Sequence, residues 1–356
     1  MAARQQLPPS QYTVGWVSAL PVELATAQAL LDETHEIPAS SPFETNIYTL
    51  GKIAGHNVVL AALPYSRIGP SLAAWETAQM KNAFPNLQFV LMVGIGGGVP
   101  QSGSGTDVRL GDVVVGKSNQ AHGGVVQYDS GKVTMGGFQR TGFLNSPPTV
   151  LLNGITELEA RRFREQLPFL KALSEISRLK EFRRETAGPD ALFEAHYDHA
   201  GSDTCGRCDN THLVNRIPRE KDVAVHYGSI ASGNKVIKSA RERDQLSAEL
   251  GGVMCFEMEA AGLMNDSPCL VVRGICDYAD SHKNKRWQPY AAGTAAAYAK
   301  ALLSVVPPLR VPEAGKEPDQ SALRSRVMKR CFGGYGISWS RKRALNCSTP
   351  QNVAND

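Results

Sequence analysis

The sequence lacks any long apolar run. No stretch of about 18 consecutive apolar residues, the length needed to span a bilayer, occurs in the 356 residues. The first residues, MAARQQLPPSQYTVGW, also lack the apolar core of a secretory signal. We therefore expect a cytoplasmic protein without membrane partners.

A pattern of paired cysteines is missing as well. The chain has seven cysteines, an odd number, and three of them (Cys255, Cys269 and Cys276) lie in apolar segments. Secreted disulfide scaffolds show an even number of cysteines, whereas intracellular proteins keep their thiols reduced. The cysteine pattern therefore favours reduced thiols and an intracellular compartment.

The body of the chain has almost no net charge. The whole sequence carries +4, but residues 310–356 contain nine basic and four acidic residues and account for +5. The remainder is therefore at −1, which gives no reason to expect nucleic-acid binding. Hydrophobic periodicity also fades at the C-terminal end, and we predict a linker or disordered tail over residues 311–356.

Two common nucleotide-binding motifs are absent, although a glycine-rich segment is present. The stretch VGIGGGVP at residues 93–100 would need glycine in place of Val99 or Gln101 to form a dinucleotide-binding G-x-G-x-x-G. It also lacks the G-K-[ST] of a P-loop. What remains is a bare loop at a strand end, where Gly96 and Gly97 can let the backbone approach a ligand closely.

Apolar runs and turn signals alternate along the chain in the manner of an α/β protein. Strands rich in β-branched residues alternate with helical periodicity, and this order predicts a sheet covered by helices on both faces. Strands are predicted at 12–20, 46–53, 56–63, 88–95, 111–116, 225–234 and 269–275, and helices at 21–33, 71–84, 258–264 and 290–306. Residues 137–222 are more polar and partly helical, which predicts an insertion.

Acidic residues stand at unexpected places in this pattern. Glu257 and Glu259 lie in the apolar stretch CFEMEAAGLMN, Asp277 ends a buried strand, and Glu23 follows Pro21 at a helix start. Asp277, Glu259 and Glu23 could each have a purely structural role, as a helix cap or as a charge that interacts with a helix dipole. Glu23, Glu259 and Asp277 together suit glycosidic cleavage, which needs an acid for the leaving group, a hydrogen-bonding group for the sugar and a base for water.

Five segments carry a resemblance to a known family. VGIGGGVP, GDVVVG, HYGSIASGN, CFEMEAAGLMN and VVRGICDYADSHKN resemble the purine/uridine phosphorylase superfamily, and in particular its methylthioadenosine/S-adenosylhomocysteine nucleosidase branch. The chain is also similar to nucleoside-phosphorylase-like modules of fungal NLR-type proteins. The resemblance implies one three-layer α/β domain over residues 12–306, with a mixed, twisted central sheet flanked by helices. It further implies that 137–222 is a fungal-type insertion and that the protein is a homo-oligomer.

The resemblance assigns roles to single residues. Asp277 matches the acid that protonates the purine at N7, and Glu23 matches the nucleosidase acid that activates water. Met258 and Glu259 match the pair that contacts the ribose. Glu257 matches a structural position. The predicted catalytic residues are therefore Asp277, Glu23 and Glu259.

The base-binding segment departs from the family at two positions. Ser232, Gly233 and Asn234 match an S-G-D turn, with asparagine in place of the aspartate, and Val236 stands where bacterial nucleosidases have phenylalanine. These differences leave the base open between adenosine-type and inosine-type substrates. The further predicted substrate-binding residues are Gly96, Gly97, Phe256 and Arg67.

The segment after the first strand favours hydrolysis over phosphorolysis. Phosphorylases of this superfamily carry G-D-P-x-R there, whereas this chain has SALPVELA, with Glu23 and no arginine. Arg67 keeps the phosphorylase alternative open. A nucleosidase acting on ATP or another nucleotide is a second alternative, with phosphates bound by Arg67, Lys235, Lys238 or Arg140. A nucleoside-sensing module with little activity is a third.

The insertion contains a candidate metal site. The stretch HYDHAGSDTCGRCD offers His196, His199, Cys205 and Cys208, two imidazoles and two thiols of the kind that bind zinc. The C-x-x-C spacing fits, but the close H-x-x-H is unusual and no second C-x-x-C follows. Such a metal would organise the insertion, since the predicted chemistry needs neither a metal nor another cofactor. The segment HKNKRW at 282–287 is predicted to be a mobile loop beside the pocket.

Overall fold

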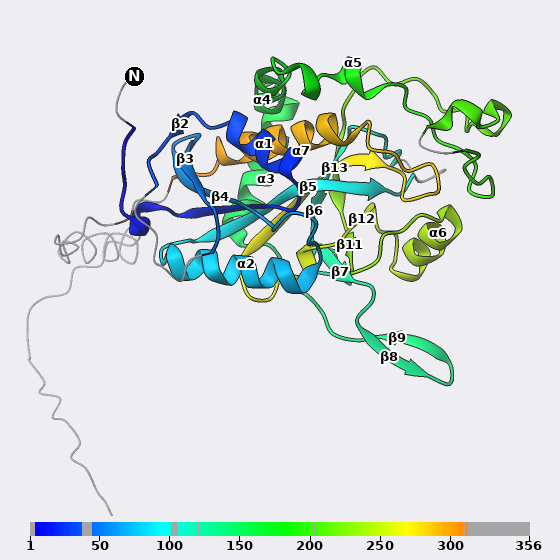
Figure 1. Ribbon diagram of the computed structural model, residues 1–356, viewed down its shortest axis with the longest axis horizontal. Coiled ribbons are helices and arrows are strands. Elements are labelled where there is room, and N and C mark those ends of the chain that lie inside the picture. The colour runs from blue at the N-terminus through cyan, green and yellow to red at the C-terminus, as the bar shows by residue number, and fades with distance from the viewer. Residues whose placement is uncertain are drawn as a thin grey trace, which may run out of the picture. The chain divides into compact units, whose positions relative to one another are not determined.

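A mixed β-sheet forms the centre of the molecule (Figure 1). The structure is a computed structural model that describes residues 4–37, 45–100, 106–119, 121–201, 204–308 and 311. These residues belong to one compact unit, Met1–Val311. The predicted tail lies outside the described residues, except for Val311.

Eleven strands of the described residues make up the central sheet. They are β1 (Val14–Ser18), β2 (Glu33–Thr34), β3 (Thr49–Ile53), β4 (His56–Ala62), β5 (Phe89–Gly98), β6 (Val113–Gly116), β7 (Val125–Gln127), β10 (Val225–Gly228), β11 (Ile230–Ser232), β12 (Cys255–Glu257) and β13 (Cys269–Asp277). The main order is β10-β6-β13-β5-β1-β4-β3-β2. β4, β1, β5 and β13 are parallel, whereas β6 runs antiparallel to β13 and parallel to β10, and β3 runs antiparallel to both of its neighbours. The predicted mixed α/β sheet is confirmed.

Helices cover the sheet on both faces and make three layers (Figure 1). They are α1 (Pro21–Ala29), α2 (Pro70–Ala83), α3 (Thr149–Phe163), α4 (Pro168–Ile176), α5 (Arg184–Ala187), α6 (Ala240–Glu249) and α7 (Gln288–Leu303). α1, α3 and α4 pack around α7 on one face, and α2 lies on the other. α3 and α4 fall within the predicted insertion, yet their buried Leu151 and Ile176 join the core beneath α7. It remains a prediction that relatives outside the fungal type lack this segment.

The central strands are apolar on both sides because both sides are covered. Along β1, Trp16 packs with the residues of α7, and Val17 packs with those of α2. The same alternation continues along β5, where Leu91 and Met92 belong to opposite clusters. The continuous apolar run at 88–95 therefore forms a doubly buried strand, as predicted.

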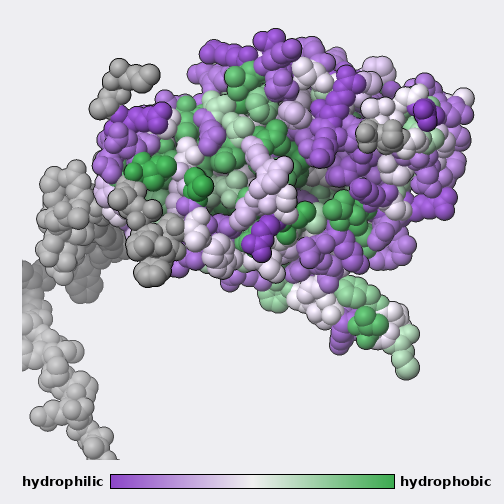
Figure 2. All heavy atoms as spheres, viewed as in Figure 1, coloured by the Kyte–Doolittle hydropathy of each residue, from purple (hydrophilic) through white to green (hydrophobic). Residues whose placement is uncertain are grey.

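The described residues form two short hairpins, one within the central sheet and one separate from it. β3 and β4 are joined through Ala54 and Gly55, which both have positive φ, as tight hairpin turns require. β8 (Gly131–Thr134) and β9 (Gly137–Arg140) form a separate hairpin that extends from the body (Figure 1). In the space-filling view the tip region shows apolar colour (Figure 2), and Met135 and Phe138 are exposed.

Two sequence predictions in the central region are wrong. The predicted helix at 258–264 is a short 3-10 turn, η5 (Ala260–Gly262), because Gly262 and the following Asn265, Asp266, Ser267 and Pro268 do not extend a helix. The Glu257 carboxylate accepts the N–H groups of residues 259 and 260 at the start of this turn. The predicted glycine loop is instead the end of β5, where Gly97 pairs with both β12 and β13. Within the described residues, no helix is both long enough and apolar enough to cross a membrane.

Candidate active site

A cavity of about 190 Å³ opens where β5 and β13 end. Ligands bind at such carboxyl ends in open α/β sheets. The cavity brings together predicted residues from the start of α1, the ends of β5 and β13 and the segments around β12. The predicted residues that line it are Glu23, Gly96, Gly97, Val236, Phe256, Met258, Glu259 and Asp277.

Glu23 caps the start of α1 and also faces the cavity. Its Oε2 accepts the N–H groups of Ala19 at 2.6 Å and Leu20 at 2.9 Å, while Oε1 accepts that of Ile95 at 2.7 Å. Burial raises the pKa of this carboxyl, although Arg273 and the three N–H groups act in the opposite direction. Glu23 therefore caps the start of α1 and also lies in the candidate active site.

Arg273 is a residue of the site that the sequence analysis missed. It lies in the middle of β13 and is fully buried, with its guanidinium in contact with Glu257 and 3.3 Å from Glu259 Oε2. Gly94 makes room for it, since a side chain there would overlap Arg273 and stand 2.5 Å from Glu23 Oε1. An arginine inside an otherwise apolar strand was the available signal, because buried arginines are nearly always paired.

The acidic cluster around Arg273 holds more carboxylates than cations. The positive charge of Arg273 attracts the carboxylates of Glu23, Glu257 and Glu259. A single guanidinium neutralises the charge of only one of the three. Burial raises the pKa of Glu259 to about 7, with Arg273 opposing and Glu257 adding to the rise. Glu257 pairs with Arg273 and holds the turn after β12, which answers why the apolar stretch has two glutamates.

A β-bulge places Asp277 in the cavity. Ile275 pairs with Gly96 and Asp277 with Gly97, so Cys276 is the extra residue. Asp277 Oδ1 accepts the N–H of Ala279 at 2.9 Å. A side chain at Gly97 would stand 2.8 Å from the same oxygen, so glycine is needed there.

Lys283 completes this end of the cavity and was not predicted as a site residue. Its ammonium lies 2.5 Å from Asp277 Oδ2, and it lines the cavity wall. Burial alone would lower the pKa of Lys283, but the Asp277 charge outweighs burial and raises it. The only signal in the sequence was its place in HKNKRW, directly after the strand that carries Asp277.

The S-G-N turn supports the cavity wall from behind and does not line it. Ser232 is fully buried and its Oγ accepts the N–H of Ala261 at 2.9 Å. The N–H of Asn234 donates to Asp129 Oδ2 at 2.6 Å, and Gly233 packs beside the same carboxylate. Asp129 therefore supplies a carboxylate behind the turn in which Asn234 replaces the family's aspartate.

The basic residues predicted for phosphate binding do not converge. Lys235 lines the cavity, whereas Arg67 lies in an exposed turn beside a cavity-lining isoleucine, Ile68. Lys238 lines a second cavity next to Asp277, and Arg140 lines a third near β7. Of these four cations, only Lys235 borders the cavity that holds the carboxylates.

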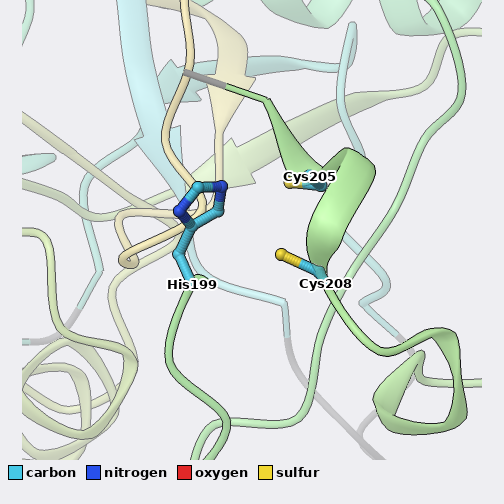
Figure 3. Close-up of side chains that lie close together, drawn as sticks. All are labelled: His199, Cys205 and Cys208. Atoms are coloured by element: carbon cyan, nitrogen blue, oxygen red, sulfur yellow. The ribbon is translucent and has the colours of Figure 1, made fainter. Parts of the chain in front are cut away.

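The predicted zinc set is brought together in part. His199, Cys205 and Cys208 lie close to one another (Figure 3), with their candidate ligand atoms all within 4.8 Å. His196 is not among them. It lies 3.4 Å from Glu194 and forms a separate group with Glu194 and His212, because the turn closed by the Tyr197 N–H and the Glu194 carbonyl keeps His196 beside Glu194.

Comparisons with known proteins place the chain in a family. Residues 13–304 match the model of the Phosphorylase superfamily. A nucleotide-binding leucine-rich repeat (NLR)-like protein of Hyaloscypha variabilis is 48% identical over 309 residues, which cover 86% of this chain but 30% of that protein. The chain thus spans under a third of this relative. A 5′-methylthioadenosine/S-adenosylhomocysteine nucleosidase of Mycobacterium tuberculosis is 23% identical, covering 83% of this chain and 98% of that one.

Solved structures show the same fold. The methylthioadenosine/S-adenosylhomocysteine nucleosidase of Neisseria meningitidis, in complex with methylthio-immucillin-A, aligns with a TM-score of 0.53 at 20% identity, covering 82% of this chain and 98% of that one. The S. pneumoniae enzyme with a transition-state inhibitor gives 0.51 at 20% identity, covering 83% and 100%. The likeness confirms the predicted nucleoside phosphorylase-like fold. By its sequence match over most of its length and by its fold, the chain belongs to the phosphorylase superfamily.

Proposed function

We propose that this protein is a purine nucleoside N-glycosidase that hydrolyses the bond between base and ribose. The observation that carries the proposal is the convergence of Glu23, Glu259 and Asp277 on one cavity from three different elements. In this reaction the purine is a poor leaving group, and the sugar becomes oxocarbenium-like in the transition state. Both the purine and the sugar therefore need a polar protein group in a fixed position to stabilise them. The relatives named as nucleosidases support the same reaction class.

Asp277 serves the departing base in this proposal. Lys283, 2.5 Å from Oδ2, holds the ionised carboxylate at the cavity wall before substrate binds. Once substrate is bound, Asp277 takes up a proton from solvent and passes it to N7 of the purine as the bond to C1′ breaks, so that the base leaves neutral. Ala279 donates its N–H to the other oxygen and fixes the direction of the group.

Met258 and Glu259 serve the ribose. Both line the cavity, and Glu259 is 5% exposed, so a hydrogen bond from a sugar hydroxyl to its carboxylate would form away from bulk water. Such a bond strengthens as positive charge develops on the sugar. Arg273 limits how far the Glu259 side chain can move, because its guanidinium lies 3.3 Å from that carboxylate.

Glu23 serves the attacking water. Its Oε1 accepts one N–H, from Ile95, and so keeps a lone pair for a water proton. The water oxygen bonds to C1′, and its proton moves to Glu23. An inorganic phosphate would instead meet Glu23 and Glu259, while two nearby cations are already paired, Arg273 with Glu257 and Lys283 with Asp277. These charges favour water over phosphate as the acceptor.

A nucleotide substrate is the second candidate, and Lys235 favours it. This lysine borders the cavity and is exposed, so it could contact a 5′-phosphate without losing an existing buried partner. A sensing module with little activity is the third, since the similar NLR-like protein is much longer than this chain. By analogy with the superfamily, we also propose a cytoplasmic homo-oligomer that uses no cofactor.

The test is chromatography of adenosine, inosine and ATP after incubation with the full chain, each with and without inorganic phosphate. Free base formed equally in both conditions would establish hydrolysis and identify the substrate. Base formed only with phosphate would establish a phosphorylase. Folded protein that releases no base from any of the three would exclude the proposal and favour sensing. Asp277→Asn is the matched control for contaminating nucleosidase.

A further inference from the structure

Three potential metal ligands converge outside the proposed catalytic cluster. Cys205 begins a short 3-10 turn, η3 (Cys205–Arg207), Cys208 follows it, and His199 faces both thiols (Figure 3). Their ligand atoms lie within 4.8 Å of one another. A tetrahedral zinc ion with two thiolates and an imidazole sets these atoms about 3.5–4 Å apart. Small side-chain rotations would therefore close the set.

A fourth ligand is available from another part of the chain. His282 Nε2 is buried and has no hydrogen-bond partner among the described residues. The other ring nitrogen, Nδ1, lies 3.9 Å from Asp280 Oδ2. Metal-binding histidines commonly have one nitrogen on the metal and the other facing a carboxylate.

His282 and His199 are already close. Their ring centroids lie 5.4 Å apart, and the backbone N–H of His199 donates to Ser281 Oγ at 3.0 Å. Cys205 and His282 also line the same second cavity, of about 730 Å³. Two segments that are more than 70 residues apart therefore meet here. The ring of His282 lies outside the group of three within 4.8 Å, so it has to move toward the thiols to complete the set.

We propose that His199, Cys205, Cys208 and His282 bind a structural zinc ion. Two thiolates and two imidazoles form a common closed zinc set that leaves no position for substrate. The ion would tie the segment around η3 to the loop after β13. That loop carries Lys283, whose ammonium contacts Asp277, so the metal would steady one end of the proposed active site. Zinc binding does not depend on the proposed function.

A neighbouring group is the main rival as a metal site. Glu194, His196 and His212 also have ligand atoms within 4.8 Å of one another. However, Glu194 already accepts a hydrogen bond from the His212 ring at 2.8 Å, and the His196 side chain is 63% exposed. The thiols, which zinc prefers, all belong to the first group.

The first measurement is the zinc content of the full chain, purified under reducing conditions without a histidine tag. We expect about one zinc ion per chain, as one tetrahedral site binds. Replacement by Co²⁺ should add the absorption of thiolate-to-cobalt charge transfer. This spectrum needs no variant, so it tests thiolate ligation even if a cysteine variant fails to fold. A chain that takes up no metal after reconstitution would overturn the proposal.

Variants then assign the ligands. Cys205→Ser and Cys208→Ser should lose the ion, while His196→Ala, the matched control from the rival group, should retain it. His282→Ala should weaken zinc binding by about 10-fold or more, measured by competition with a zinc-binding dye. Retention in Cys205→Ser with loss in His196→Ala would place the metal in the rival group. An unchanged affinity in His282→Ala would remove that residue from the set. A Cys205–Cys208 disulfide found by mass spectrometry in reduced preparations would also contradict the site.

Discussion

Single glycines create the space that the charged side chains of the site occupy. Gly94 leaves room for Arg273 and Glu23, and Gly97 leaves room for the Asp277 carboxylate. A methyl group at either position would meet a charged group within a region already fully packed. Conformational freedom is therefore not the reason for glycine here; the reason is the absence of a side chain.

The first prediction concerns the acid at the base. Asp277→Asn removes the proton that the departing purine needs, and a lost general acid typically lowers kcat by about 10²–10⁴-fold. The amide can still accept the N–H of Ala279, but Lys283 loses its ion-pair partner, so the melting temperature should fall, and circular dichroism checks that the variant is folded at the assay temperature. Glu220→Gln, an exposed acid outside the cavity, is the control and should keep wild-type kcat. A kcat above a tenth of wild type would remove Asp277 from the chemistry.

The second prediction concerns pH. Glu259 carries the negative charge that stabilises the oxocarbenium-like sugar only when it is ionised, and burial raises its pKa to about 7. The carboxyl therefore takes up a proton as the pH falls through 7, and kcat/KM should decline below that value. A pH profile between 5 and 9 measures this limb, which Glu259→Gln should remove along with much of the activity. A wild-type profile that stays flat down to pH 5 would contradict the role.

The third prediction concerns the buried arginine. Arg273→Met leaves Glu257 without its cation, and breaking a buried ion pair in this way costs about 3–5 kcal/mol of unfolding free energy. Combining it with Glu257→Gln should recover part of the loss, because the uncompensated charge is then gone. Urea unfolding of the two single variants and the double variant measures the coupling. Additive losses would show that the pair does not interact.

At the scale of elements, the site depends on how closely α7 lies on β13. Gly274 of β13 faces the backbone of Ala291 in α7, and any side chain at 274 would overlap that carbonyl. The same strand carries Arg273 one residue before and ends at the bulge with Asp277. The close approach of this helix thus fixes the strand that supplies two of the charged groups.

A methyl group at position 274 tests this packing. Gly274→Ala forces α7 away from β13 and should cost about 1–3 kcal/mol or more, the usual effect of overpacking a core. Gly136→Ala in the exposed β8–β9 hairpin, where the nearest atom would be 3.8 Å away, should change stability by less than about 0.5 kcal/mol. Thermal and urea unfolding of both variants provide the comparison, and equal stability of the two would contradict the argument.

At the scale of the whole molecule, one buried histidine joins a strand of the N-terminal part of the sheet to the end of the last helix, α7. His56 begins β4, and its Nε2 lies 3.1 Å from the carbonyl of Leu303 and 3.0 Å from that of Val306 after α7. Its Nδ1 is buried without a partner among the described residues. Burial lowers the pKa of His56, although the two carbonyls act in the opposite direction.

This arrangement predicts a loss of stability in mild acid. Below pH about 6.5, the ordinary histidine pKa, the unfolded chain binds a proton that the folded His56 resists, so the free energy of unfolding falls. Glu23 and Glu259, with raised pKa values, act in the opposite direction below neutral pH. The difference between wild type and His56→Gln isolates the histidine. Urea unfolding at pH 7.5 and 5.5 should show a smaller loss in the variant, and an equal loss would exclude His56.

The sequence by itself determined the framework of this protein. The apolar runs of β1, β5 and β13 and the helix start at Pro21 are local patterns, and they predicted α/β layers without any contact information. Glu23, Glu259 and Asp277 were also visible, since acids at strand ends stand out against apolar neighbours.

Only the tertiary structure decided what those residues meet. Arg273 pairs with Glu257 across two strands, Lys283 returns to Asp277, and His282 rather than His196 comes close to His199. The 3-10 turn after Glu257 is held at its start by that carboxylate and by Ser232 Oγ, which accepts the N–H of Ala261. Each of these outcomes depends on side-chain contacts, most of them between distant segments, and hydrophobic periodicity carries no information about such contacts.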